Sequence, residues 1–133
     1  MPDLKHAENF QDLIVYQKAR QASRIVFELS KCFPREEAYS LTDQIRRAVR
    51  SVGAQIAEAW GKRRYERHFV NKLTDADAEQ KETQHWIDTA HDCQYVSNSQ
   101  RDQVLSLLFE VGRMLNAMIA KSEQFCRSSE GES

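Results

Sequence analysis

Residues 40–61 carry an apolar side chain at every third or fourth position, which is the spacing of one face of an α-helix. These positions are Leu41, Ile45, Ala48, Val49, Val52, Ile56 and Ala59. Ser40 can accept a backbone N–H as the N-cap residue, and Asp43 suits the positive end of the helix. Gly61 suits the left-handed position after the last turn. The stretch is therefore predicted to form a helix with one buried face.

A second, polar row runs along the same predicted helix. Arg47, Ser51, Gln55 and Glu58 follow the helical spacing about 200° of rotation from the apolar row. The ordinary explanation is that such a row faces solvent. Alternatively it contacts another copy of the chain, where Arg47 and Glu58 would pair between neighbours and set the register. The predicted subunit interface comprises Arg47, Ser51, Gln55, Glu58 and Trp60, because tryptophan is more often a core or interface anchor than a base-stacking platform.

The composition allows long helices and one domain. Of 133 residues only four are glycine and two are proline, and both prolines precede residue 35. A chain of this length buries about two-thirds of its unfolded surface as a single domain. Three cysteines without a C-x-x-C spacing favour reduced thiols in the cytosol. We expect a cytoplasmic protein without a membrane segment, because the sequence has neither a signal pattern nor an apolar run of about 18 residues.

Three more helices are predicted from apolar spacing. The first runs from Phe10 and ends at Pro34, which pushes the residue before it out of helical geometry. Another covers about residues 65–93, and the last runs from Ser99, as its N-cap residue, to about residue 125. The inner face of the 65–93 helix is poor in large aliphatic residues, which suggests close helix approach: Phe69, Leu73, Ala76, Gln80, Thr83, Ile87 and Ala90.

Four helices joined by short connectors favour an all-α fold, namely an antiparallel up-down-up-down four-helix bundle. The bundle is predicted to span residues 10–126. Residues 1–9 and 127–133 are predicted to be disordered, since both segments are polar.

Charge is distributed unevenly along the chain, although 19 basic and 20 acidic residues nearly cancel overall. Residues 46–72 hold eight basic and two acidic side chains, whereas residues 73–92 hold six acidic and one basic. The basic zone predicts contacts with nucleic-acid phosphate, with Trp60 and Tyr65 available for stacking. Alternatively the basic residues form a solvated turn or pair with the acidic zone of another copy. The candidate nucleic-acid-binding residues are Lys62, Arg63, Arg64, Arg67 and Lys72.

Several motifs resemble those of one known family. They are Phe10-Gln-Asp-Leu-Ile-Val-Tyr-Gln-Lys-Ala19, Phe33-Pro34 with Glu37, Leu41-Thr-Asp-Gln-Ile-Arg-Arg-Ala48, and Ser51 with Ile56-Ala-Glu58. With them the chain resembles the 23S rRNA intervening-sequence protein family, also called the four helix bundle proteins. Gly53, Gln55 and Ala59 stand where family members typically have Pro, Asn and Gly, which indicates a divergent branch.

The resemblance implies a four-helix bundle that assembles as a ring-like homopentamer, with no established enzymatic activity. Genes of this family occur within intervening sequences of ribosomal RNA genes. A similar bundle is the accessory protein of diversity-generating retroelements, where it partners a reverse transcriptase and RNA. The resemblance therefore implies RNA or a nucleic-acid enzyme as the partner class.

An enzymatic alternative comes from Glu82 and His85, which form one Glu-x-x-His pattern of the kind found in carboxylate-bridged metal bundles. The full site needs a second such pattern, and the chain has no other. A local interaction on an exposed helix face is the simpler explanation. The three cysteines fall at predicted helix C-termini, where the dipole disfavours a thiolate, and we interpret them as packing residues. We predict no catalytic residue, no metal and no cofactor.

The sequence thus predicts a cytoplasmic, non-enzymatic homo-oligomer, a pentamer according to the resemblance. It would act as a binding or scaffold protein for RNA or a nucleic-acid enzyme, without a membrane or small-molecule partner. Two alternatives stay open: a purely structural or protein-interaction assembly, and a metal-dependent enzyme that uses Glu82 and His85.

Overall fold

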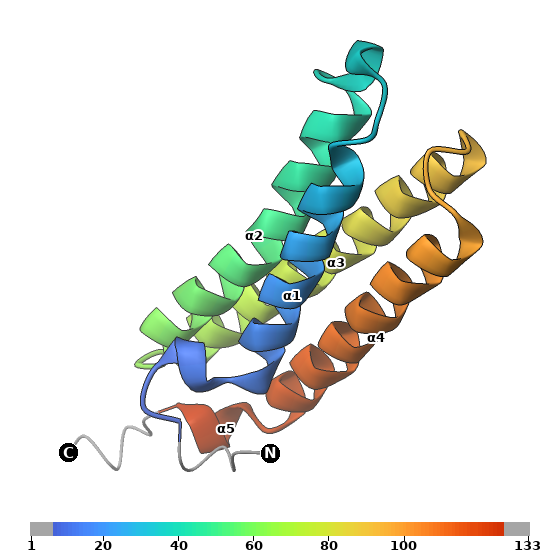
Figure 1. Cartoon of the computed structure of the whole chain (residues 1–133). Helices are drawn as coiled ribbons and strands as arrows, with labels where there is room; N and C mark the ends of the chain where they lie inside the picture. Colours follow the sequence, from blue (N-terminus) through green and yellow to red (C-terminus); the bar gives the residue numbers. More distant parts are fainter. Residues whose placement is uncertain (1–6, 127–133) are drawn as a thin grey trace, which may run out of the picture.

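The computed structural model describes residues 7–126, which form four long helices and no strand (Figure 1). The long helices are α1 (Ile14–Ser30), α2 (Leu41–Gly61), α3 (Glu66–Asp92) and α4 (Asn98–Ala120). Three short helices accompany them: the 3-10 helices η2 (Phe10–Asp12) and η3 (Arg35–Glu37), and α5 (Ser122–Phe125).

The predicted disordered segments lie outside the described residues, except for residues 7–9. There the backbone N–H groups of Glu8 and Asn9 donate to the Asp12 carboxylate over 3.0 and 3.3 Å.

The four long helices run alternately up and down (Figure 1). α1 packs against α2 and α4, and α3 packs against the same two helices, so each helix contacts its neighbours in the chain. η2 and α5 lie together at one end of this arrangement. The predicted all-α four-helix bundle is confirmed.

The buried faces agree closely with the apolar spacing. All seven apolar positions predicted for α2 are buried, and the buried residues of α3 are the seven predicted for its inner face. Gln80 and Thr83 lie between two apolar clusters of the core. Gln80 Nε2 donates to Asp77 over 2.8 Å, and a Cβ added at Gly112 would lie 2.8 Å from the same nitrogen. The predicted close helix approach therefore occurs between α3 and α4, where glycine leaves room for the glutamine.

The structure corrects the predicted end of the first helix. α1 ends at Ser30, four residues before Pro34. The backbone N–H groups of Cys32 and Phe33 then donate to the carbonyls three residues earlier, those of Leu29 and Ser30. Phe33 is thereby turned into the core, where its ring lies 5.6 Å from that of Tyr95. Packing of Phe33, and not Pro34 alone, decides where this helix stops.

Ser40 occupies the predicted N-cap position of α2, but its predicted capping hydrogen bond and the predicted role of Gly61 are wrong. The Ser40 hydroxyl accepts no backbone N–H and instead donates to the Glu37 carboxylate over 2.5 Å. The same carboxylate accepts the Leu41 N–H at 3.5 Å, so the preceding 3-10 helix supplies the acceptor. Gly61 lies inside the helix without a positive φ, and Lys62 follows as its C-cap.

The connector between α3 and α4 uses two motifs that the sequence pattern did not indicate. Gln94 has a φ of 64°, its N–H donates to the His91 carbonyl, and the Tyr95 N–H donates to Ala90. This is a Schellman motif built with glutamine in place of glycine. α4 then begins one residue after Ser97 and ends at Ala120, so the predicted cap at Ser99 and the continuation to residue 125 are wrong.

Ser97 is expected to stabilise α4, because it forms a capping box with Gln100. Its hydroxyl accepts the Gln100 N–H at 3.0 Å, and the Gln100 side chain accepts the Ser97 N–H at 2.9 Å. We predict that Ser97→Ala lowers the free energy of unfolding by about 1 kcal/mol. Urea denaturation measures this, with the exposed Ser99→Ala as the matched control. Equal losses in both variants would contradict the assigned cap.

A hydrogen bond between Tyr95 and Glu37 joins the α1–α2 connector to the α3–α4 connector, at the end of the bundle far from η2. The Tyr95 hydroxyl donates to the Glu37 carboxylate over 2.9 Å. Hydrogen bonds from Ser40 and then from Tyr95 lower the pKa of Glu37 below its usual range. The same bond, followed by partial burial, raises the pKa of Tyr95 to about 12. The α1–α2 and α3–α4 hairpins are thus linked at this end by a charge-assisted hydrogen bond.

α4 is long and apolar enough to cross a membrane, with a mean hydropathy of 1.2 in its most apolar window. Its buried face nevertheless packs into the bundle core through residues such as Val104, Leu108 and Leu115. The apolar character of α4 is therefore explained by its place in the core.

Candidate nucleic-acid interface

The turn between α2 and α3 presents a group of exposed basic residues around one exposed aromatic ring. Lys62 is the C-cap of α2 and Arg64 lies in the turn, while Arg67 lies in the first turn of α3. Tyr65 is 57% exposed, and the Arg64 guanidinium lies 5.8 Å from the centre of its ring. The His68 ring also lies nearly perpendicular to the Tyr65 ring, with the ring centres 5.6 Å apart. We call Lys62, Arg64, Tyr65 and Arg67 the basic turn.

Acidic residues do not neutralise the basic turn through ion pairs. In the described part of the chain, Lys62, Arg64 and Arg67 form no salt bridge with a carboxylate. The nearby Glu66 carboxylate accepts a short hydrogen bond from Ser122, which ties α3 to α5. The basic turn therefore keeps its positive charges at the surface.

The structure changes the roles of Trp60 and Arg63. Trp60 is only 9% exposed and belongs to the core, so it cannot stack on a base. The Arg63 guanidinium lies 3.5 Å from the centre of the Trp60 ring, and its Nε donates to the Trp60 carbonyl over 2.8 Å. Arg63 therefore covers the core tryptophan at the end of α2, and Tyr65 is the aromatic ring accessible to a ligand.

Lys72 lies five residues after Arg67 on α3 and is also engaged within the chain. Its Nζ lies 3.4 Å from Glu58 of α2. Of the five basic residues proposed from the sequence, Lys62, Arg64 and Arg67 form the exposed set, whereas Arg63 and Lys72 contact α2.

The polar row of α2 lies on the side of that helix next to α3. Arg47 pairs with Asp43 one turn earlier at 3.1 Å, and Glu58 pairs with Lys72. Ser51 and Gln55 are half-buried, and the Gln55 side-chain oxygen is buried without a hydrogen-bond donor. Within one chain the row thus has internal partners for its charges and one unsatisfied acceptor. The predicted subunit interface at this row stays a prediction, and Trp60 belongs to the core beneath it.

Comparison with known protein families gives a match over most of the chain. The model of the 23S rRNA-intervening sequence protein family matches residues 11–117, which include all four long helices up to Ala117. The chain belongs to this family. The match confirms the resemblance that the helix motifs indicated.

A solved member of a similar family has the same fold. The chain is similar to a protein of unknown function from the S23 ribosomal protein family of Bacteroides thetaiotaomicron, with 26% sequence identity and a TM-score of 0.73. The match covers 80% of this chain and 98% of that protein. No curated protein matches the chain. This chain thus shares its fold with a solved protein of unknown function.

Glu82 and His85 do not converge on a metal site with other described residues. Glu82 accepts the Trp86 indole N–H at 3.0 Å, and the His85 ring packs at a steep angle against the same indole. Among residues 7–126, no three His, Cys, Asp or Glu side chains are grouped so that they could hold an ion. The Glu-x-x-His pattern therefore forms a local contact around Trp86 in this family member.

The cysteines differ from their predicted role. Cys32 and Cys93 are exposed, so the interpretation of these two as packing residues is wrong. Cys126 is half-buried, and its burial raises the pKa of the thiol.

Sequence reasoning missed a second basic surface, which lies between α1 and α2. Arg20 and Arg24 lie one turn apart on the exposed side of α1, and Arg50 is exposed on α2 beside them. The signal was present in the spacing of Arg20 and Arg24, but the pairing of this row with Arg50 needs the packed helices.

Proposed function

We propose that this protein is a non-catalytic, cytoplasmic scaffold that binds RNA through the basic turn and assembles as a ring-like homopentamer. The observation that supports RNA binding most directly is the exposed aromatic ring of Tyr65 among Lys62, Arg64 and Arg67. The charges of these three cations are not paired with carboxylates in the described residues.

The chemistry of the basic turn suits single-stranded nucleic acid. Lysine and arginine bind phosphate, and release of condensed counterions makes this binding favourable at low salt. A base can stack on the face of Tyr65 because base–aromatic stacking needs no particular base. We therefore propose phosphate contacts from Lys62, Arg64 and Arg67, one stacked base on Tyr65, and little base specificity.

Assembly would multiply this weak site. One basic turn offers three cations, whereas copies joined in a ring present one turn each to the same RNA. Binding of a second turn is then intramolecular, and the apparent affinity exceeds that of one copy. An enzyme that acts on nucleic acid is a further proposed partner, since it could be held on the same RNA.

Binding to RNA should weaken steeply as salt rises. We expect a titration of the purified chain with single-stranded RNA to give a plot of log affinity against log salt with a slope of about −2 for each engaged turn. Fluorescence anisotropy measured from low to physiological salt provides this slope. Absence of binding at low salt, or binding that salt leaves unchanged, would contradict the proposed RNA contact and favour a purely structural assembly.

A further inference from the structure

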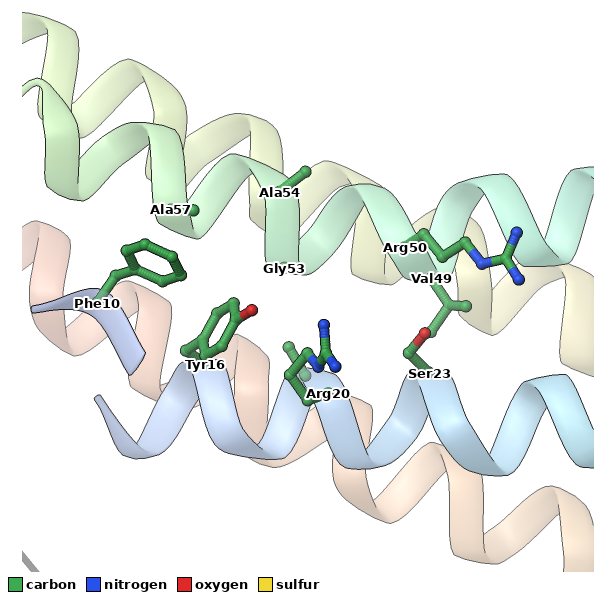
Figure 2. Close-up of a pocket in the computed structure, with 10 residues that line it drawn as sticks. Phe10, Tyr16, Arg20, Ser23, Val49, Arg50, Gly53, Ala54 and Ala57 are labelled. Carbon is green, nitrogen blue, oxygen red and sulfur yellow. The ribbon is translucent and has the colours of Figure 1, made fainter. Parts of the chain in front are cut away.

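A groove with one apolar and one basic end runs between α1 and α2 (Figure 2). It has a cavity volume of about 260 Å³. Tyr16 lies against the backbone of Gly53 at the apolar end, near Ala57. Arg20 rises from α1 toward α2, and Arg50 lies toward the other end. The small residues Gly53, Ala54 and Ala57 form the floor of the groove and leave space for a slender surface. The two arginines favour a surface that is acidic.

The basic end of the groove has no carboxylate partner in the described residues. Arg20 and Arg50 are exposed and form no salt bridge there. The Arg50 guanidinium lies 5.8 Å from the centre of the Phe27 ring, and that of Arg46 lies 4.8 Å from it. Phe27 is partly exposed, so the groove continues into a surface of cations on an aromatic ring.

α3 carries the complementary charge. Asp75, Glu79 and Glu82 follow helical spacing, so they form one acidic stripe on the outer surface of α3. None of the three takes part in a salt bridge within the described residues. Partial burial, and then the charges of Glu82 and Asp75, raise the pKa of Glu79. The stripe therefore has mutual repulsion that a cation from outside would relieve.

Two cations near the acidic stripe form ion pairs with other carboxylates. Lys72, which lies on this side of α3, pairs with Glu58, and Arg47 on α2 pairs with Asp43. The exposed Ala78 lies on the surface of α3 between Asp75 and Glu82. The stripe thus combines two flanking carboxylates with a small central residue, and this shape matches the small floor and the arginines of the groove.

We propose that the α1–α2 groove of one copy receives the acidic stripe on α3 of a second copy. This docking rests on the proposed assembly and assigns its contact surfaces. Arg20 and Arg50 would pair with Asp75, Glu79 and Glu82 of the neighbour, and Ala78 would approach Gly53 and Ala54.

The position of the two surfaces favours a closed assembly. The contact is heterologous, because the groove and the stripe are different surfaces of each copy. The groove lies on the α1–α2 side, and the stripe lies on the α2–α3 side. In a square bundle these sides meet at about 90°, so repeated contacts with aligned helices turn into a small ring instead of a straight fibre.

Charge reversal and charge swap test this docking. Sedimentation of the full chain measures its oligomeric state. Reversal of the groove with Arg20→Glu and Arg50→Glu, or of the stripe with Asp75→Arg and Glu82→Arg, should raise the dissociation constant at least about 100-fold, because like charges would then meet. The chain with all four substitutions should assemble again, because opposite charges then meet once more at each contact.

The double variant Arg113→Glu with Lys121→Glu is the control for a general effect of surface charge. Both residues are exposed outside the groove, and this variant should assemble as the parent chain does. Circular dichroism checks folding of each variant. Assembly that survives either reversal, or a four-substitution chain that stays monomeric, would overturn the docking while leaving the proposed oligomer intact. A parent chain that is monomeric would overturn both.

Discussion

Phe69→Ala is expected to lower the free energy of unfolding by about 3–5 kcal/mol. Phe69 is completely buried, and its ring stacks on that of Phe125 with the centroids 5.7 Å apart. Truncation would remove this contact and leave a cavity between α3 and α5, since the close-packed core relaxes only partly. A domain of this size is commonly stable by about 5–15 kcal/mol, so the loss is a large fraction of the total.

Urea denaturation followed by circular dichroism measures the effect of Phe69→Ala. Phe109→Ala is the matched control, because Phe109 is 48% exposed on α4 and its truncation should cost far less. Nearly equal losses for the two variants would contradict the assignment of Phe69 to the core. Tyr65 and Arg67 lie four and two residues before Phe69, at the start of α3. We therefore also expect the destabilised variant to bind RNA more weakly at raised temperature.

Reversing the charges of the basic turn is expected to have the second large effect, a loss of RNA affinity. The triple variant Lys62→Glu, Arg64→Glu and Arg67→Glu should lower the affinity for single-stranded RNA at least about 100-fold at low salt, since three proposed phosphate contacts become repulsive. The three side chains are exposed and belong to no salt bridge in the described residues, so the fold should be unchanged. Arg63 is left unchanged because it covers Trp60.

The control for this variant carries the same net charge. Lys31→Glu, Arg35→Glu and Arg113→Glu reverse three exposed cations at the end of α1, on η3 and on α4, away from the basic turn. Anisotropy titrations at matched salt should show much weaker binding for the first variant and a minor change for the control. Equal losses would indicate a response to total charge and would exclude a local site at the turn. Sedimentation of both variants should show the oligomeric state of the parent chain.

The inner faces of the helices were predictable because helical spacing alone decides which side chains share a face. α3 demonstrates this well, since even its polar inner positions, Gln80 and Thr83, are buried as predicted. The helix ends were less predictable. Ser40 and Ser99 both look like N-cap residues in the sequence, yet Glu37 and Ser97 provide the acceptors. Caps depend on backbone direction at one residue, and packing of the connectors sets that direction.

The candidate sites divide in the same way. The concentration of basic residues around the α2–α3 turn was visible in the sequence, and the turn does expose Lys62, Arg64 and Arg67. The engagement of Arg63 by Trp60 and of Lys72 by Glu58 was not visible, because these contacts depend on how α2 ends and on its register with α3.

The sequence by itself determined the four helices, their inner faces and the family, because these depend on local spacing and on motifs within single segments. Tertiary structure decided which charges stay exposed and which are paired. It also formed the α1–α2 groove from Arg20 and Arg50, two residues 30 positions apart that share no local pattern. Only packing of the helices brings such residues together, since their proximity depends on interhelical register and not on periodicity within either helix.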